Sequence, residues 1–471
     1  MAVYKAGRSP AIRVRRLVTL TIAAALVSLA GVVTRVIAMS GQHADVSTSQ
    51  AAGSVAVASS DAANGLTTFD AAWTAIRETY VDESRTDADW DALRTEFRPR
   101  AARATTPDEV RGVLRDLLAR IGHSHFDLLS SAVRARLDRA AADPSEVGSI
   151  GAELTPIDGE LVISRVDPSS PAREAGLSPG AVIEAIDDVE IRDAAGTMRS
   201  PDFERWATAQ SLMRGTTGTE ISLRVRDLAG HTSVRKVSRA REQGQPVTLG
   251  HLPTFFARLD RLVQDAGNGR HVAVVRFNVW MVPLAGAIDR AVDESRDADG
   301  IVIDLRGNPG GVLSMLMGVS GHFLDAPVRL GTLRTRDSEL NLVANPRTVT
   351  TDGRRVVPYH GPLAILVDQT SYSASEIFAA GMQAIGRARV FGQQTPGGAL
   401  PAMLRELPSG DVLEYAIGDF VTATGQRIEG NGVVPDQVVA PSRASLAAGR
   451  DVVLDAAVEW AAARPAQQKG E

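Results

Sequence analysis

The C-terminal half of the chain alternates short apolar runs with stretches of helical periodicity, and this pattern constrains the fold most strongly. Runs typical of buried strands lie at residues 271–277, 300–304, 363–367 and 388–391. Stretches with apolar residues at helical spacing lie at residues 283–296, 312–323, 374–385 and 451–462. Because strands that alternate with helices pack as layers, we predict an α/β layered domain over residues 247–462.

Two further folded parts precede this domain. Residues 66–143 have the apolar spacing of helices, and Thr106 followed by Pro107 and two acidic residues is a typical helix start. Residues 145–241 contain short β-branched runs separated by glycines. A chain of 471 residues is too long for one hydrophobic core. We therefore predict a multidomain α/β protein with an N-terminal helical cap, a β-module and the layered core.

The N-terminus combines positive charge with an apolar run. Lys5 and several arginines precede residues 17–33, which carry no charge and show no polar face. This order is typical of a secretory signal or an uncleaved transmembrane anchor over residues 1–38, and a buried core helix is the less favoured alternative. The charges predict a cytoplasmic start and an exported, periplasmic or otherwise extracytoplasmic body. Residues 39–65, rich in Ala, Ser and Gly, are predicted to be a flexible linker, and residues 463–471 a polar tail.

Composition excludes several kinds of site. The chain has no cysteine, which excludes thiol nucleophiles, zinc–thiolate sites, iron–sulfur clusters and disulfides. The formal net charge of −5 argues against a nucleic-acid partner. The chain has three lysines, Lys5, Lys236 and Lys469, and all of them lie outside the predicted layered domain.

Two loops of the layered domain are candidate sites. Ser373 lies on a serine-rich turn between the strand 363–367 and a helix, where a hydroxyl projects and the next backbone N–H points the same way. The run 301–311 ends a strand in the small-residue loop DLRGNPGG, which lets backbone N–H groups approach an oxyanion. Each loop alone has an ordinary interpretation, since a helix cap accounts for the first and a tight turn or phosphate loop for the second.

The β-module resembles a PDZ domain, particularly the variant of exported proteases. The resemblance is carried by SSPAREAGLSPGAVIEAIDD, residues 169–188. It implies that an extended peptide adds to the module as a strand, and that N–H groups near Ile150, Gly151 and Ala152 hold the peptide's terminal carboxylate. A module that only shapes or covers a neighbouring site is the alternative.

The segments DLRGNPGG and SYSASEI, about sixty residues apart, together resemble the tail-specific or C-terminal processing serine proteases and their relative, the tricorn core protease. The similarity spans about residues 66–460. It implies a crotonase-like or ClpP-like core, with Ser373 as the nucleophile. The N–H groups of Gly310 or Gly311 and of Ala374 match the oxyanion hole. Acyl-enzyme chemistry of this kind requires no metal or nucleotide cofactor.

The general base distinguishes two branches of this family. In the tail-specific branch a lysine follows the serine by about twenty-five residues, but Gly398 stands at that position here. Arginine cannot replace the lysine, because its guanidinium does not release a proton at usable pH. The tricorn-like branch uses a histidine in a G-x-S-H element, present here as residues 122–125, and a late carboxylate in the element RIEGNGVVPD. By this resemblance His125 is the base.

The resemblance assigns the remaining roles. His125 would accept the Ser373 proton and return it to the leaving amine, while Glu429 would orient and stabilise the imidazolium. Ser124 would form a hydrogen bond within the triad. The other interpretations are a metal pair of His123 and His125, ordinary loop histidines, and a surface ion pair for Glu429.

The sequence therefore predicts an exported serine endopeptidase. Its substrates would be polypeptides, presented by their C-termini through the PDZ domain, and an uncleaved N-terminal segment would hold it at the membrane. A ligand-binding protein that has lost hydrolysis, or a PDZ adaptor on the same fold, are the competing hypotheses. Retention of the serine, histidine, glutamate and oxyanion loop argues against both.

Overall fold

A computed structural model describes residues 54–80, 87–135, 143–194, 200–247 and 254–464. The predicted signal or anchor, residues 1–38, lies outside these ranges. Within them, none of the helices is both long and apolar enough to cross a membrane. Helix α3 begins at Ser54, so that residues 54–65 of the predicted linker are helical, in keeping with the high helix propensity of alanine.

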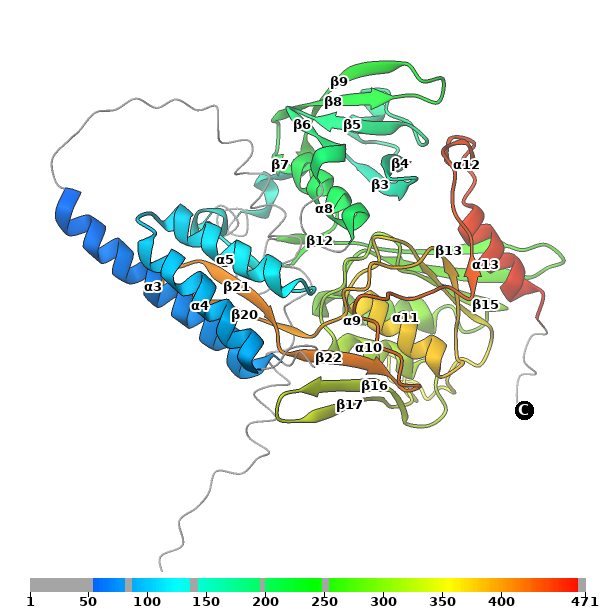
Figure 1. The fold of residues 1–471 in the computed structure, drawn as a ribbon. Helices are drawn as coiled ribbons and strands as arrows, with labels where there is room; N and C mark the ends of the chain where they lie inside the picture. Colours follow the sequence, from blue (N-terminus) through cyan, green and yellow to red (C-terminus); the bar gives the residue numbers. More distant parts are fainter. Residues whose placement is uncertain (1–53, 81–86, 136–142, 195–199, 248–253, 465–471) are drawn as a thin grey trace, which may run out of the picture.

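Three helices form the cap at one side of the molecule (Figure 1). They are α3 (Ser54–Thr79), α4 (Asp87–Arg103) and α5 (Pro107–Ile121). Helix α5 begins where the sequence predicts, with Thr106 and Glu109 in a reciprocal capping box. The buried faces of the three helices share one core, which includes Phe69, Phe97 and Leu114.

A hairpin from the C-terminal part of the chain completes this cap. Its strands are β20 (Ala402–Glu406) and β21 (Val412–Ala416), which form a sheet with β1 (Asp127–Leu129). Leu413 lies opposite Leu128 in this antiparallel sheet and is buried in the core of the cap. The hairpin therefore fixes the segment just before β1 against the rest of the molecule.

The β-module lies above the core and has the PDZ arrangement (Figure 1). Its sheet has the order β3-β4-β5-β8-β9, with strands at Ala152–Ile157, Glu160–Val166, Val182–Ile186, Glu220–Arg226 and Thr232–Ser238. The short elements of the module are β2 (Val147–Ser149), β6 (Val189–Glu190), β7 (Gly215–Thr216), β10 (Ala240–Arg241), α7 (Pro171–Glu174) and 3₁₀ turns at Pro144–Glu146 and Ile191–Ala194. Helix α8 (Pro201–Met213) packs beside β3, which is an edge strand.

The C-terminal domain is layered, as predicted. Its six-stranded sheet has the order β13-β14-β15-β18-β19-β23, with strands at Leu259–Asp265, His271–Phe277, Gly300–Asp304, Leu363–Val367, Arg389–Gly392 and Gln437–Val438. All neighbours pair in parallel except the antiparallel edge strand β13. Strands β15 and β18 have the predicted bounds, because they are apolar runs buried on both faces.

Helices cover both faces of this sheet. Alternate strand residues pack against α9 (Val282–Asp293), α10 (Ser314–Gly321) and α11 (Ala374–Ala384) on one face and α13 (Val452–Ala462) on the other. A second sheet and a small hairpin were not predicted: β16 (Val328–Thr335) with β17 (Glu339–Ala344) and β22 (Gly418–Thr422), and β11 (Gln245–Val247) with β12 (Phe255–Ala257).

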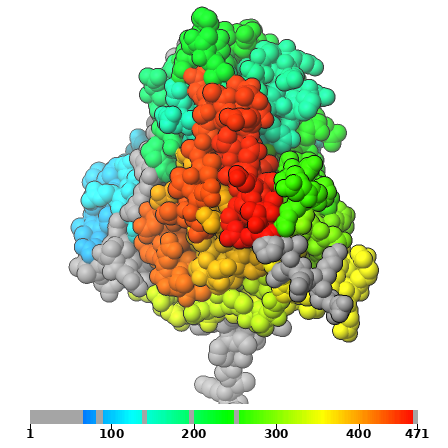
Figure 2. Space-filling view, turned by 90° about the vertical axis from the view of Figure 1, so that its right-hand side faces the viewer, coloured from blue at the N-terminus to red at the C-terminus, as the bar shows by residue number. Residues whose placement is uncertain are grey.

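The C-terminal segment links the core to the PDZ domain. Figure 2 shows it as an orange and red strip that rises from the yellow core to the green and teal PDZ residues. At its upper end, in α12 (Arg443–Ala447), the Arg443 Nε donates a hydrogen bond of 2.8 Å to the Gly180 carbonyl. Helix α12 thus contacts the PDZ domain directly.

Candidate active site

Ser373 lies on the turn between β18 and α11, at the carboxyl edge of the parallel sheet. Its backbone has φ 55° and ψ −115°, a region that residues with a Cβ rarely adopt. The turn places the hydroxyl beside His125, whose backbone also has a positive φ of 58°. The distance from Ser373 Oγ to His125 Nε2 is 3.2 Å, although 248 positions separate them.

The other two predicted residues complete a chain of contacts behind the imidazole. The Ser124 hydroxyl lies 2.8 Å from His125 Nδ1 and donates a 2.8 Å hydrogen bond to Glu429 Oε2. The Ser124 N–H donates to the other carboxylate oxygen at 2.9 Å. Glu429 thus reaches His125 through the Ser124 hydroxyl, the residue for which the resemblance implied a hydrogen bond within the triad.

Burial controls the charges of this group. Burial lowers the pKa of His125 to about 3, so the imidazole is neutral. Burial also raises the pKa of Glu429, although hydrogen bonds from Ser124 and from the Ala399 N–H oppose the shift. Because the Ser124 hydroxyl donates to Glu429, it accepts from His125 Nδ1–H. The lone pair of Nε2 therefore faces the Ser373 hydroxyl.

A series of three aromatic rings supports the imidazole, and the first of them stacks directly on it. Tyr372 stacks on His125 with centroids 5.3 Å apart and an interplanar angle of 18°. Phe203, from helix α8 of the PDZ domain, stacks on Tyr372 in turn, with ring centroids 4.2 Å apart. Trp206 of the same helix packs against Phe203. The PDZ domain therefore contributes directly to the surroundings of His125.

The tyrosine also explains why glycine occupies position 398. A Cβ on Gly398 would lie 2.0 Å from the Tyr372 ring, so the space of a longer side chain is already filled. The Gly398 carbonyl accepts a 3.1 Å hydrogen bond from the Ser373 N–H. A lysine at this position is thus incompatible with the packing of this site.

The structure distinguishes between the predicted oxyanion donors. The Gly310 N–H donates to Asn308 Oδ1 at 2.9 Å. The backbone of Trp280 forms hydrogen bonds with the residues before and after Gly311. This pairing leaves the Gly311 N–H unused. Ala374 is the first residue of α11, and among the described residues neither its N–H nor that of Gly311 has an acceptor. These two N–H groups are the better candidates.

The predicted peptide-binding residues lie elsewhere. Ile150, Gly151 and Ala152 line a cavity of about 380 Å³ between the PDZ domain and the core. The imidazole site adjoins a separate, smaller cavity of about 50 Å³, lined by His125, Tyr372 and Phe203 among others. The sequence-predicted residues thus form two regions, one around Ser373 and one at the edge of β3.

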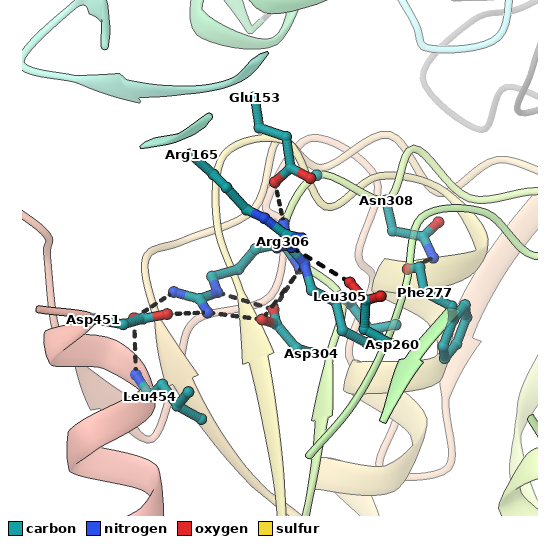
Figure 3. Close-up of polar contacts among 12 residues, drawn as sticks. Glu153, Arg165, Asp260, Phe277, Asp304, Leu305, Arg306, Asn308, Asp451 and Leu454 are labelled. Atoms are coloured by element: carbon teal, nitrogen blue, oxygen red, sulfur yellow. Dashed lines mark hydrogen bonds and ion pairs between the residues drawn. The ribbon is translucent and has the colours of Figure 1, made fainter. Parts of the chain in front are cut away.

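An ion-pair network fixes the loop that follows β15 (Figure 3). The Arg306 guanidinium donates to both carboxylate oxygens of Asp304 and of Asp451, at distances of 2.7 to 2.9 Å. The Asn308 side chain donates to the Phe277 carbonyl at 2.9 Å. Asp304 and Arg306 therefore organise the loop.

The described residues do not support the metal-pair interpretation. His123 contacts the Tyr80 hydroxyl through Nδ1. No group of three metal-ligating side chains occurs in the described part of the chain. The sequence did not single out Tyr372, Phe203 or Glu376, the last of which accepts from the Ser373 N–H at 3.0 Å. The S-x-x-E spacing of a capping box was the signal available for Glu376.

Family models match all three parts of the chain. Residues 62–119 match the tricorn protease C1 domain, residues 162–227 a PDZ domain, and residues 271–439 peptidase family S41. By this match, residues 271–439 are identified as an S41 peptidase domain. The protein is accordingly a serine-type peptidase. The S41 match covers Ser373, Glu376 and the oxyanion loop.

Several similar proteins are named as carboxyl-terminal-processing or tail-specific proteases. The carboxyl-terminal-processing protease of Picosynechococcus is 28% identical over 78% of this chain and 81% of its own length. The protein of the same name from Synechocystis is 26% identical over 82% and 84%. The tail-specific protease of Haemophilus influenzae is 25% identical over 77% and 51%.

Solved structures show the same fold. The photosystem II D1 C-terminal processing protease aligns with a TM-score of 0.57 at 21% identity, over 80% of this chain and 93% of that one. Mature CPAF aligns with a TM-score of 0.57 at 13% identity, over 84% and 97%. At these identities the comparison shows the fold alone.

Proposed function

We propose that this S41 peptidase is an exported endopeptidase that uses Ser373 as nucleophile and His125 as general base. The contact of 3.2 Å between His125 Nε2 and Ser373 Oγ carries this proposal. Ser124 and Glu429 orient the base, because the Ser124 hydroxyl accepts from Nδ1–H and donates to the carboxylate.

In the proposed reaction, Ser373 Oγ attacks the carbonyl carbon of the scissile peptide bond and its proton passes to His125 Nε2. The N–H groups of Gly311 and Ala374 stabilise the oxyanion. The C–N bond then breaks, and His125 donates the proton to the leaving amine. Water, deprotonated by His125, hydrolyses the acyl-enzyme and regenerates the Ser373 hydroxyl.

The pKa of His125 is lowered to about 3 because the imidazole is buried away from water. The imidazolium that forms during the reaction requires compensation, which the path through Ser124 to the buried Glu429 carboxylate supplies. Transfer of the Ser373 proton to His125 therefore depends on the hydrogen bond between His125 Nδ1 and the Ser124 hydroxyl.

A fluorophosphonate probe tests the nucleophile. We expect labelling of the wild type, none in Ser373→Ala, and a decrease of about 100-fold or more in labelling rate in His125→Ala. Ser371→Ala is a matched control, because this neighbouring hydroxyl donates to the Leu305 carbonyl and not to His125. Failure of the folded wild type to react would favour the alternative, a binding protein that has lost hydrolysis.

We further propose that substrates are polypeptides bound by their C-termini at Ile150, Gly151 and Ala152. The support is the PDZ match and the position of β3 as an edge strand facing the 380 Å³ cavity. One peptide with a free C-terminus and the same peptide amidated should differ in KM, with the free acid binding more tightly. Equal KM values would contradict recognition of the carboxylate.

Export is proposed from the basic and apolar order of residues 1–38. An alkaline phosphatase reporter fused behind these residues should be active only outside the cytoplasm. Replacing the apolar residues 17–33 by a polar sequence should abolish that activity. Reporter activity without this segment would contradict the proposal.

A further inference from the structure

Glu376 is a buried carboxylate that the proposed reaction does not use. It lies three residues after Ser373, in the first turn of α11, and its exposure is 0%. Among the described residues, no arginine, lysine or histidine lies within ion-pair distance of it. A buried carboxylate without a cationic partner is costly, so its presence calls for a compensating set of hydrogen bonds.

Four neutral donors surround this carboxylate. Oε1 accepts from Thr395 Oγ1 at 2.5 Å and from the Gly397 N–H at 2.7 Å. Oε2 accepts from the Ser373 N–H at 3.0 Å and from the Gly398 N–H at 2.9 Å. One side chain thus binds the backbone of the nucleophile and three residues of the loop 395–398.

The same loop holds the other end of the site. Its next residue, Ala399, donates its N–H to Glu429 Oε2 at 3.0 Å. The Gly397 carbonyl accepts from the Gly430 N–H at 2.7 Å. Thr395 Oγ1, which donates to Glu376, also accepts from the Val433 N–H at 2.7 Å. The carboxylate of Glu376 is therefore the junction between the Ser373 turn and the Glu429 loop.

We propose that Glu376 is a positioning residue, whose ionised carboxylate holds the Ser373 turn and the loop 395–399 in the register that the contact between Ser373 and His125 requires. This inference rests on the proposed function, because it describes how the same site is kept in order. Loss of the negative charge then lowers turnover without removing any group that touches the substrate.

The negative charge of Glu376 matters because four groups donate hydrogen bonds to its carboxylate. An ionised carboxylate accepts from all four, whereas a protonated one turns an O–H toward an N–H and loses at least one hydrogen bond. Burial raises the pKa of Glu376 to about 7, although hydrogen bonds from Thr395, Gly397, Ser373 and Gly398 oppose the shift. The carboxylate therefore gains its proton as the pH falls through the neutral range.

Three other titratable groups face this junction. The pKa of His125 is about 3, and that of Tyr372 lies well above its ordinary value, so neither changes charge near pH 7. Burial raises the pKa of Glu429 as well. The variant that removes the Glu376 titration alone therefore identifies which carboxylate is responsible for an acid limb.

The test compares Glu376→Gln with the wild type in the full chain, using a peptide substrate from pH 5.5 to 9. In the wild type, kcat should fall by about tenfold per pH unit below about pH 7. In Glu376→Gln, kcat at pH 8 should be lower by about 10- to 100-fold, KM should change little, and the acid limb near pH 7 should vanish.

Thermal unfolding separates positioning from a structural role. Because the pKa of Glu376 is higher in the folded protein, the Tm of the wild type should fall as the pH rises from 5.5 to 8, and this part of the pH dependence should be absent in Glu376→Gln. The matched control is Asp411→Asn, since Asp411 is 1% exposed and binds the Ser131 N–H at 2.7 Å outside the site. It should lower Tm and leave the pH profile of kcat unchanged.

Three outcomes overturn the inference. The first is wild-type kcat in Glu376→Gln, and the second is an acid limb near pH 7 that persists in this variant, which would assign the limb to Glu429. The third is a loss of kcat that follows a loss of Tm. Fluorophosphonate labelling keeps the proposed function separate: a wild type that reacts at Ser373 upholds it even if Glu376→Gln behaves like the wild type.

Discussion

At the scale of single residues, the unusual member of the site is the serine between histidine and glutamate. Ser124 contacts both His125 Nδ1 and Glu429 Oε2 at 2.8 Å, so the carboxylate acts on the ring only through this hydroxyl. We predict that Ser124→Ala lowers kcat by about 100-fold with little change in KM, because the imidazolium loses its path to Glu429.

Ser124→Thr tests whether the hydroxyl itself is responsible, since it restores that group and should recover most of the lost turnover. The control is Ser130→Ala, because Ser130 is 7% exposed and accepts from the Val133 N–H in the same segment. Stopped-flow measurement of acylation gives the rates. Equal acylation rates in Ser124→Ala and the wild type would show that Glu429 acts on His125 by another route.

At the scale of elements, helix α8 joins the PDZ domain to the imidazole. Phe203 of this helix is 1% exposed and stacks on Tyr372, which stacks on His125. We predict that Phe203→Ala lowers the free energy of unfolding by about 3 to 5 kcal/mol and also lowers kcat, because the ring behind His125 loses its support. Chemical denaturation and peptide hydrolysis measure the two effects.

Phe203→Leu separates packing from stacking, since it keeps most of the apolar volume but not the ring. Phe391→Leu is the control, because Phe391 is also fully buried but contacts Trp460 of the C-terminal helix, away from His125. A kcat loss in Phe391→Leu as large as that in Phe203→Leu would mean that destabilisation alone reduces turnover.

Elements also show how far the sequence supports a prediction. The strands at 300–304 and 363–367 were predicted with the observed bounds, because continuous apolar runs with flanking turns have few other interpretations. The hairpin of β20 and β21 was not predicted, because β20 (AMLRE) is only half-buried and its Met403 packs against the core of the distant cap. Local patterns carry no record of such long-range packing.

The functional site, like the fold, was predicted only in part. Motif matches predicted which residues belong to it, and their catalytic roles stay predictions. The G-x-S-H element implied a hydrogen bond for Ser124, but the positive φ of His125 is a backbone conformation that no residue pattern reveals. Glu376 was missed because an acid three residues into a helix has a sufficient local explanation as a cap.

At the scale of the whole molecule, charged side chains hold the PDZ domain on the core (Figure 3). Glu153 on the edge strand β3 accepts from Arg276 of β14 at 2.7 Å and from Arg258 at 3.3 Å. Burial alone would raise the pKa of Glu153, but the charges of Arg276 and Arg258 outweigh it, and the pKa lies below its ordinary value. Ionised Glu153 therefore stabilises the interface.

The sign of this shift determines the pH dependence of stability. Because the pKa of Glu153 is lower in the folded protein, its contribution is complete above about pH 4.5 and is lost as the pH falls toward the folded value. We predict that Glu153→Gln lowers the free energy of unfolding by about 2 kcal/mol at pH 7, since it removes the charged partner that Arg276 and Arg258 share. The difference from the wild type should shrink below pH 4.

A second ion pair in the same interface provides the matched control. Arg165 and Asp260 lie 3.3 Å apart, but their side chains are 42% and 48% exposed, so solvent screens the pair. Asp260→Asn should therefore change the free energy of unfolding by less than about 0.5 kcal/mol at any pH. Urea denaturation of the three proteins at pH 7 and pH 4 measures all these differences. Equal losses in Glu153→Gln and Asp260→Asn would show that burial of the Glu153 contacts does not make them stronger.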